Sequence, residues 1–375
     1  MSTIAVNAIT DAAGGNTATI NGMTPTADSL QGFRNRIING DMRIDQRNAG
    51  ASVTVGAGAS YQIDRWQSFS EQASKFSVQR STVVPTGFTN SLLATSLSAY
   101  SVLTGDRFII RQNIEGFNVA DLGWGTANAQ SVTVSFWVRS SLTGSFGGFI
   151  GNSAIDRSYP FSYTISAANT WEQKTITIPG DTTGTWLTDN GVGLRLGFSL
   201  GAGATYSGTA GAWASSQILQ PTGSVSVVGT SGATFYITGV QLEAGSVATP
   251  FERRPYGTEL QLCQRYYFKI QASGDNSTFG IGMGTTTTVA DCLINFPVPM
   301  RIAPSALEQS GTASDYRVRQ GGSEITCSVV PSNVFTATQT TANVRATVSS
   351  GLTVASSIPL RSTTSSAYLA WSAEL

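Results

Sequence analysis

Alternation of apolar and polar residues is the feature that most restricts how this chain can fold. In residues 132–138, valine and phenylalanine alternate with threonine and serine, and residues 192–200 repeat the pattern with Arg195 on the outward side. A period of two residues is typical of a strand with one buried face. Turn clusters rich in glycine, such as PGDTTG and GTSGAT, separate these runs. Many short strands joined by such turns predict an all-β, jelly-roll β-sandwich.

One strand in the second half of the chain carries a change of phase. Phe235 and Ile237 share one face, whereas Val240 and Leu242 fall one position out of register. An extra residue in a strand sends every later side chain to the opposite face, and a β-bulge restores the original face. The sequence therefore predicts a bulge at Gly239.

Charge is scarce in this chain of 375 residues. Charged residues make up 12% of it, against about a quarter in ordinary soluble domains, and serine, threonine and 40 glycines take their place. This composition is typical of all-β proteins exposed outside cells or on virus particles. The net charge is zero and no basic block occurs, so we expect no affinity for nucleic acid. No apolar run reaches about 18 residues, so we expect no membrane insertion.

The first residues, MSTIAVNAITDAAGG, lack the basic and apolar regions of a secretory signal. The three cysteines, Cys263, Cys292 and Cys327, form no close pair, and an odd number argues against a disulfide framework. We therefore expect synthesis in a host cytoplasm, without export by the usual route.

The chain contains no histidine. This removes the commonest general base, the Ser-His and Cys-His nucleophile pairs and the commonest transition-metal ligand. Paired carboxylates, such as Asp41 with Asp45 or Glu243 with Glu252, are the remaining route to catalysis, as in glycoside hydrolysis. Solvated or arginine-paired carboxylates are the interpretation that we favour for these residues. We therefore expect no enzyme activity, no cofactor and no bound metal.

Two segments carry a resemblance to a known family. Residues 32–48, GFRNRIINGDMRIDQRN, and residues 235–269, which include VQLEAG and FERRPYGTELQLCQRYY, resemble sequences of phage tail fibres and related virion appendages. The jelly-roll domains of those proteins are similar to carbohydrate-binding modules. The resemblance implies that the two segments are the opening and closing strands of one sandwich. Such modules often hold a structural calcium there, but Arg43 stands where they have a glutamate, and no metal is assigned.

The resemblance also implies a function and a place. We expect a non-catalytic subunit of the virion, on the tail, that contributes to attachment to a glycan or receptor on the host surface. A purely structural virion protein, such as a head fibre or an adaptor, is an alternative. A carboxylate-based hydrolase of capsular glycans is a second alternative.

The expected organisation has four parts. Residues 1–32 form an N-terminal segment that docks to other virion proteins, or else a disordered arm. Residues 33–257 form the jelly-roll sandwich, residues 258–269 a linker helix, and residues 270–375 a smaller C-terminal β domain that points outward. The helix begins at a possible N-cap, Thr258.

An apolar stripe on that helix favours self-association. Leu260, Cys263 and Tyr267 recur at the spacing of a coiled-coil seam. A helix this short is not stable alone in water and has to pack on something. Because fibres of the family are trimeric, we expect a homotrimer with this stripe on its axis. Packing of the helix on its own sandwich is the alternative.

Glycan recognition requires exposed aromatic rings, because the C–H face of a sugar packs on them. Trp66 and Trp137 lie within strand patterns and are expected in the core. Aromatic residues in loops are the candidates for ligand binding, although each can equally pack under its own loop or at a subunit contact. These candidates are Trp186, Tyr206 and Trp213 in the sandwich, and Tyr316, Tyr368 and Trp371 in the C-terminal domain.

Overall fold

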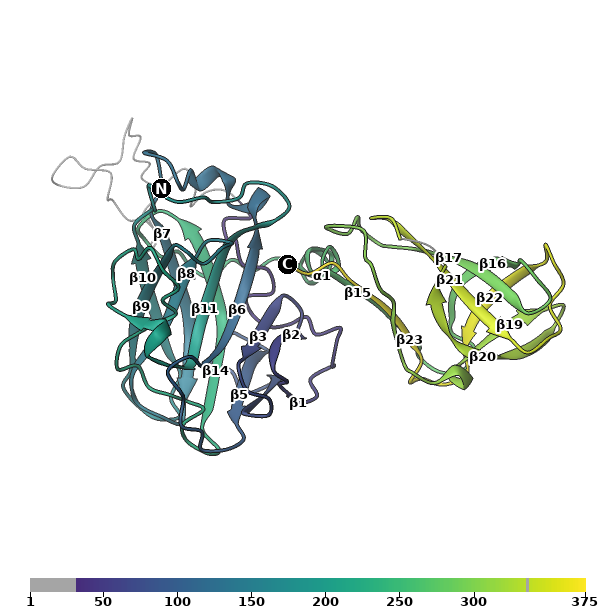
Figure 1. Cartoon of the computed structure of the whole chain (residues 1–375), viewed down its shortest axis with the longest axis horizontal. Helices are drawn as coiled ribbons and strands as arrows, with labels where there is room; N and C mark the ends of the chain where they lie inside the picture. The colour runs from purple at the N-terminus through teal and green to yellow at the C-terminus, as the bar shows by residue number, and fades with distance from the viewer. Residues whose placement is uncertain (1–31, 335–336) are drawn as a thin grey trace, which may run out of the picture. The chain divides into compact units, whose positions relative to one another are not determined.

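The protein, described by a computed structural model over residues 32–334 and 337–375, folds into two compact units that divide between Arg254 and Pro255 (Figure 1). The predicted docking segment, residues 1–32, lies outside the described residues except for its last residue. Regular structure in the described part is almost entirely strand, with one α-helix, which confirms the all-β prediction. Among the same residues, no helix has the length and hydropathy that a membrane span requires.

Two six-stranded antiparallel sheets build the first unit. The β14 sheet contains, in spatial order, β1 (Val53–Thr54), β4 (Phe76–Ser81), β5 (Ser91–Ser96), β14 (Thr234–Ala244), β7 (Val132–Ser140) and β10 (Glu172–Ile178). The β11 sheet contains β2 (Gly58–Ile63), β3 (Trp66–Ser70), β6 (Arg107–Glu115), β11 (Val192–Ala202), β8 (Gly144–Gly151) and β9 (Ser158–Ile165). The chain changes sheet between β1 and β2, β3 and β4, β5 and β6, β6 and β7, β7 and β8, β9 and β10, β10 and β11, and β11 and β14. This crossing between layers is that of a jelly-roll sandwich, as predicted.

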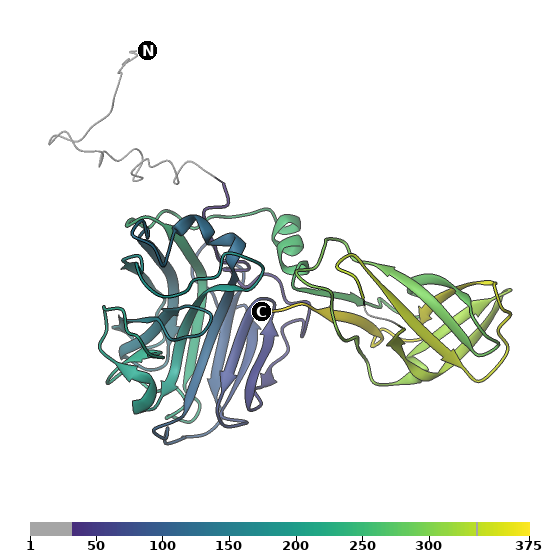
Figure 2. The ribbon, with the colours of Figure 1, turned by 45° about the horizontal axis from the view of Figure 1, so that its top comes forward.

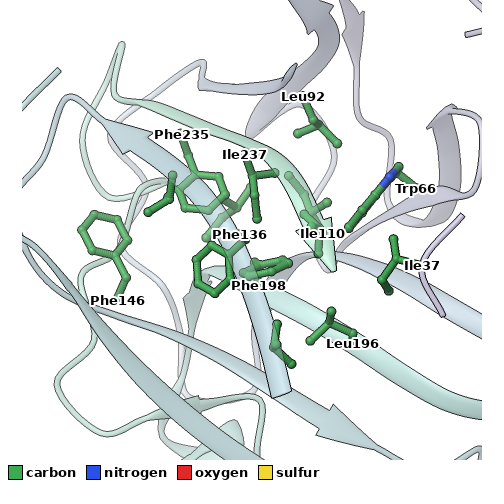
Figure 3. Packing of buried hydrophobic residues seen from close by; sticks show 14 of the residues in the cluster. Ile37, Trp66, Leu92, Ile110, Phe136, Phe146, Leu196, Phe198, Phe235 and Ile237 are labelled. Carbon is green, nitrogen blue, oxygen red and sulfur yellow. The ribbon is translucent and has the colours of Figure 1, made fainter. Parts of the chain in front are cut away.

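The space between the two sheets is filled by aromatic and branched side chains (Figure 3). The ring of Phe198 on β11 lies 5.0 Å from that of Phe136 on β7 and 6.5 Å from that of Phe235 on β14, centroid to centroid. Trp66 is buried, as predicted. Trp137 is only half-buried, because its neighbours in β7 point inward and the alternation turns its own side chain outward.

The predicted bulge lies in β14. Thr238 pairs with Trp137 and Gln241 pairs with Ser135, so three steps on β14 match two steps on β7. Gly239 has a φ of 60°, a conformation that costs glycine little. Phe235, Ile237, Val240 and Leu242 are all fully buried. The phase change in the sequence therefore marks a real bulge that returns the apolar side chains to the core.

Residues 32–48 contain no strand, so the prediction of an opening strand there is wrong. The backbone turns at Asn39 and Met42, which both have a φ of 58°, and a left-handed residue interrupts an extended chain. The segment nevertheless adjoins the closing strand. β5 pairs with β14 only as far as Ile237, and residues 35–40 then take its place. The N–H of Arg36 donates to the Leu242 carbonyl at 2.8 Å.

We call the contact between residues 33–40 and residues 240–254 the polar seam. The Asn35 side chain is buried in it and accepts hydrogen bonds from the N–H groups of Ile37 and Leu242, both at 3.0 Å. Its amide donates to the Val240 carbonyl at 3.1 Å. The buried Arg254 guanidinium donates to the carbonyls of Asn35 and Ile37. The seam thus joins the beginning and the end of the first unit through paired, buried polar groups.

Gly40 makes the seam sterically possible. The Val240 N–H donates to the Gly40 carbonyl at 2.9 Å. A Cβ on Gly40 would lie 2.2 Å from the Val240 carbonyl oxygen, a distance that no side chain tolerates. The glycine in the NGD motif is therefore required by the close approach of two backbones.

The second unit begins with α1 (Tyr256–Gln264) and continues as two β structures (Figure 2). A three-stranded sheet contains β15 (Tyr267–Gln271), β23 (Tyr368–Ser372) and β18 (Glu308–Gln309). A closed barrel contains β16 (Thr278–Gly284), β17 (Val289–Asn295), β21 (Thr341–Val348), β20 (Ser323–Asn333), β19 (Tyr316–Gln320) and β22 (Ser357–Ser362). Closure leaves the barrel without a free sheet edge. None of the three cysteines is in a disulfide, and all three are buried.

The helix begins and ends earlier than the predicted range of 258–269. Pro255 occupies the N-cap position instead of Thr258, and its carbonyl accepts the Glu259 N–H at 3.0 Å. Tyr267, Phe268 and Lys269, which the prediction places in the helix, include two β-forming aromatic side chains. They begin β15, which pairs with β23 from Tyr267 to Gln271. Pairing with a strand distant in sequence has overridden the local helix pattern.

Replacing Asn35 by alanine is expected to lower the free energy of unfolding of the first unit by about 2–4 kcal/mol. The change leaves the buried N–H groups of Ile37 and Leu242 without their acceptor. Denaturation followed by tryptophan fluorescence measures the effect. Asn128→Ala, at an exposed loop position, is the matched control and is expected within about 0.5 kcal/mol of the wild type. Equal losses in the two variants would contradict a structural role for the seam.

Candidate functional site

Three tryptophans meet at one end of the sandwich. The ring centroids of Trp124 and Trp186 lie 4.7 Å apart, those of Trp124 and Trp213 5.4 Å, and those of Trp186 and Trp213 5.6 Å. All three pairs pack edge to face, the arrangement that aromatic quadrupoles favour. We call Trp124, Trp186 and Trp213 the tryptophan cluster. Tyr159 extends it, with its ring 5.3 Å from that of Trp213.

Loops that are far apart in sequence position these rings. Trp124 follows the 3-10 helix η3 (Ala120–Leu122), Trp186 lies between β10 and β11, and Trp213 lies after β11. Each indole N–H donates to a carbonyl: Trp124 to Gln130 at 2.7 Å, Trp186 to Thr183 at 3.1 Å and Trp213 to Pro179 at 2.9 Å. With their polar atoms satisfied within the protein, the rings are fixed in place and present apolar surface.

Glycine next to Trp124 allows the close packing. Gly125 has a φ of 83°, and a Cβ there would lie 3.2 Å from the Trp186 ring and 2.8 Å from the Gly184 carbonyl oxygen. A larger residue at 125 would therefore separate the loops that carry Trp124 and Trp186. The G-W-G triplet is the signal in the sequence for Trp124, a residue that the sequence analysis did not include.

An ion pair between Arg157 and Asp181 packs against the cluster. The Arg157 guanidinium donates to both carboxylate oxygens of Asp181, at 2.7 and 2.8 Å, and its centre lies 5.9 Å from the Trp213 ring. Burial raises the pKa of Asp181, but hydrogen bonds from Arg157 and Thr183 outweigh it, so the pKa falls below its usual value. A paired guanidinium over an aromatic ring holds that ring by charge and by contact.

A small hollow, open to solvent, lies beside the cluster. Its walls are mostly apolar, and two of the indoles contribute to them. Trp186 and Trp213 are half-buried, whereas Trp124 is only 8% exposed. Trp186 and Trp213 therefore keep ring surface at the protein boundary. The lining residues are Val119, Ala120, Leu122, Trp124, Trp186, Leu187, Thr188, Gly193 and Leu194.

Tyr206, the third predicted aromatic in the sandwich, lies apart from the tryptophan cluster. It packs with Phe149 and Leu219 in a small apolar group that includes Ile109 and Phe69. These side chains belong to the outer face of the β11 sheet, away from the main core. The Arg107 guanidinium lies 5.0 Å from the Tyr206 ring. The sequence correctly places Tyr206 in a loop, but the structure assigns it to a different surface.

Two of the aromatic candidates in the second unit are core residues, which corrects their interpretation as ligand contacts. Tyr316 and Trp371 are both 0% exposed. Trp371 stacks on Phe268 with 6.2 Å between centroids, and the Tyr316 hydroxyl donates to the Tyr368 carbonyl at 2.6 Å. Both residues belong to regular strands, β19 and β23, and pack in the core of the second unit. Tyr368 is half-buried, with the Lys269 ammonium 4.4 Å from its ring.

The structure distributes the predicted oligomer residues between surface and interior. Cys263 and Tyr267 are 0% and 3% exposed within the chain, and Leu260 is half-buried. Of these three, Leu260 has surface left for a partner. Tyr256, one helical turn before Leu260, is 56% exposed. Exposed Tyr256 and half-buried Leu260 are at positions i and i+4, which lie on one face of a helix, and Leu262 is half-buried as well.

The carboxylates considered for catalysis have structural partners. Asp41 pairs with Arg43 at 2.5 Å, and burial raises its pKa although Arg43 lowers it. Asp45 accepts the N–H groups of Asn48 and Gly50, at 2.9 and 2.6 Å. Within the described ranges, no group of three or more aspartate, glutamate, cysteine or histidine residues is arranged to hold a metal ion.

Glu243 and Glu252, the other pair, belong to the polar seam and its surroundings. Glu243 accepts hydrogen bonds from the N–H and the hydroxyl of Thr249, at 2.8 and 2.6 Å. Glu252 accepts the Asn35 N–H at 2.9 Å and lies 3.3 Å from Arg254. These carboxylates hold the two ends of the first unit together.

No protein-family description matches the sequence, and no curated protein is similar to it at a significant level. Among solved structures, the chain is similar to the enzymatically active domain of tailspike protein 4 from bacteriophage CBA120, at 11% identity and a TM-score of 0.29, over 56% of this chain and 22% of that chain. It is also similar to a putative sugar binding protein from Bacteroides thetaiotaomicron, at 11% identity and a TM-score of 0.33, over 56% of this chain and 100% of that chain.

A third similar structure is the family 11 carbohydrate-binding module of a cellulosomal cellulase from Clostridium thermocellum, at 13% identity and a TM-score of 0.28, over 52% of this chain and 99% of that chain. The similarity spans 29% of an α-L-arabinofuranosidase, so it covers less than a third of that enzyme and of the tailspike domain. Such low identities and TM-scores mark a loose resemblance in architecture and identify no ligand.

Replacing Asp181 by asparagine is expected to lower the thermal unfolding midpoint at about pH 7 and to flatten its dependence on acid. Because the folded-state pKa is lowered, the carboxylate stabilises the fold above the unfolded-state pKa, near 4. That contribution is lost as pH falls through the folded-state value. Unfolding midpoints between about pH 7 and pH 2 test this. Asp121→Asn removes an exposed ion pair with Arg36 and is the control, for which little effect is expected. If the midpoint of Asp181→Asn depends on pH as that of the wild type does, Asp181 is not a stabilising carboxylate.

Proposed function

We propose that this chain is a non-catalytic subunit of a phage fibre or another virion appendage, and that it contributes to attachment to glycans on the host surface. The observation that carries the proposal is the tryptophan cluster beside an apolar hollow at one end of the sandwich. Fixed aromatic rings at the protein boundary suit the apolar face of a sugar. The sequence resemblance of residues 32–48 and 235–269 to phage fibre proteins supports the place on the virion.

Two features of the cluster favour recognition over a purely structural role. Its indole N–H groups are bonded within the protein, so the exposed surface of Trp186 and Trp213 is apolar. Thr188, in the wall of the hollow, and the exposed Thr185 supply hydroxyl groups near the rings. Apolar walls with a few polar groups are the usual composition of a small-molecule site.

Replacing Trp186 by alanine is expected to weaken retention of a bound polysaccharide by at least about tenfold, because tryptophans in binding sites often account for more than 1.4 kcal/mol. Surface polysaccharides extracted from a panel of bacteria are passed over the immobilised protein, and their viscosity is followed separately. Trp171→Ala, at a half-buried position outside the cluster, is the matched control.

The outcomes of this experiment separate the candidate functions. Retention without loss of viscosity, reduced only by Trp186→Ala, supports an adhesin. Falling viscosity indicates a hydrolase and contradicts the proposal. If no extracted polysaccharide is retained and none is cleaved, the result favours a purely structural virion protein.

We further propose a homotrimer in which α1 meets its copies. The support is exposed Tyr256 with half-buried Leu260 on one face of the helix. We also propose that residues 1–32 dock to other virion proteins and that the second unit points outward; this assignment rests on the sequence alone.

Replacing Leu260 by aspartate is expected to convert trimers to monomers, because it places a charge in an apolar contact. Light scattering measures the mass, and circular dichroism checks that the strands persist. Leu103→Asp, at a loop position 60% exposed, is the control that keeps the trimer. If the Leu260→Asp variant remains trimeric, the interface lies elsewhere. The exposed apolar side chains of β16 and β17 are then the next candidates: Ile281, Met283 and Leu293.

A further inference from the structure

A second surface of the first unit gathers arginines on the outer face of the β11 sheet. Arg195 on β11 lies opposite Asn113 on β6, and Gly197, two residues further on, lies opposite Arg111. On the other side of β6, Arg111 lies opposite Gln67 of β3. Arg111 and Arg195 are therefore diagonal neighbours on adjacent strands and point to the same face. We call Arg107, Arg111 and Arg195 the arginine face.

Among the described residues, no carboxylate pairs with Arg111 or Arg195, whereas Arg107 has one. Arg107 pairs with Glu71 at 3.3 Å. The Arg111 Nε donates to the Gln67 amide oxygen at 2.6 Å, which is a neutral acceptor. The buried Nε of Arg195 has no hydrogen-bond acceptor among the described residues. Arg111 and Arg195 thus differ from Arg157 and Arg254, which donate to carboxylates and carbonyls.

The pKa values of Arg111 and Arg195 reflect their burial and the positive charges near them. Burial, and then the neighbouring Arg195, lower the pKa of Arg111 to about 10. Burial also lowers the pKa of Arg195, with a smaller contribution from Arg107, while Tyr61 raises it. The ionisable groups that act on the pair are therefore other arginines and a tyrosine. A buried charge without a counter-charge is costly, and a bound anion would relieve that cost.

Aromatic side chains lie beside these arginines. The Phe69 ring lies 4.2 Å from the Arg107 guanidinium and 5.9 Å from that of Arg111. Phe149 and Tyr206 belong to the same apolar group as Phe69. Because the arginine side chains stack on rings, their donors are held at fixed positions. The surface thus combines oriented donors with apolar rings.

We propose that the arginine face binds an anionic substituent of a polysaccharide, a carboxylate, sulfate or phosphate group. The proposal rests on the proposed attachment function and adds that the glycan is acidic. Planar guanidinium groups match carboxylate and sulfate oxygens with paired hydrogen bonds. Arg195, which is half-buried, supplies one positive charge, and the neighbouring Arg111 supplies a second.

Three polymers with one backbone test the proposal: dextran, carboxymethyl-dextran and dextran sulfate, measured against the full chain by biolayer interferometry at physiological salt. At least one anionic polymer is expected to bind about tenfold or more tightly than dextran. The two anionic arms distinguish a carboxylate from a sulfate ligand. Arg195→Gln is expected to lose at least about tenfold in affinity for the polymer that binds.

The matched control is Arg139→Gln, which removes a half-buried arginine from β7 in the other sheet. It is expected to leave the affinity within about twofold, because charge removed far from a contact is screened. Equal losses in Arg139→Gln and Arg195→Gln, or equal binding of dextran and its anionic forms, overturn the proposal. Polythymidylate binding that depends on Arg195 also overturns it, since the ligand would then be a nucleic acid.

Two further measurements separate the possible failures. Circular dichroism and the unfolding midpoint establish that Arg195→Gln is folded, and an anionic polymer should raise that midpoint in the wild type and not in the variant. If bacterial polysaccharides are retained through Trp186 while Arg195→Gln binds as the wild type does, the attachment function stands and the acidic ligand is wrong. If no bacterial polysaccharide is retained, the attachment function fails by itself.

Discussion

The polar seam is the interaction on which the rest of the first unit depends. Burial of apolar side chains supplies most of the free energy of such a core, but it is not directional. Hydrogen bonds from Asn35 and Arg254 are directional and fix where residues 35–40 lie along β14. The consequence reaches the candidate site, because Arg36 pairs with Asp121 at 2.5 Å and donates to the Asn118 carbonyl at 3.3 Å. These residues precede Trp124, so the seam also positions the loop that carries the first indole.

The fold could be predicted where the sequence pattern and the tertiary contacts agree. The alternation in residues 132–138 predicts a strand, and the phase change at Gly239 predicts a β-bulge. The structure contains both. Residues 32–48 were misassigned because their backbone hydrogen bonds are made through left-handed turns and side chains, which a two-residue period does not describe. The helix was extended too far because pairing between β15 and β23 joins segments separated by most of the second unit. Local patterns contain no information about such a partner.

The candidate site could be predicted only in part, for a related reason. Trp186 and Trp213 were found because tryptophan in a polar, glycine-rich loop has no core to enter locally. Trp124 and the ion pair that supports the cluster were missed, since three separate loops bring them together. Trp371 was misassigned because its strand is short and its alternation is weak. Burial there is decided by Phe268 and Phe296, whose rings lie 6.2 and 5.2 Å from it.

One physical criterion separates the arginines of the first unit that stabilise the fold from those that are candidates for a function. The criterion is whether the guanidinium has hydrogen-bond acceptors within the protein. A buried guanidinium that stabilises a fold requires acceptors, and Arg157 and Arg254 have them in carboxylates and carbonyls. Arg195 is partly desolvated and lacks such acceptors among the described residues, and Arg111 has one neutral acceptor. Arg195 pairs across the sheet with Gly151, and the loop after Gly151 leads to Arg157 and the tryptophan cluster. The tryptophan cluster and the arginine face are thus joined along the chain by the segment between Gly151 and Arg157.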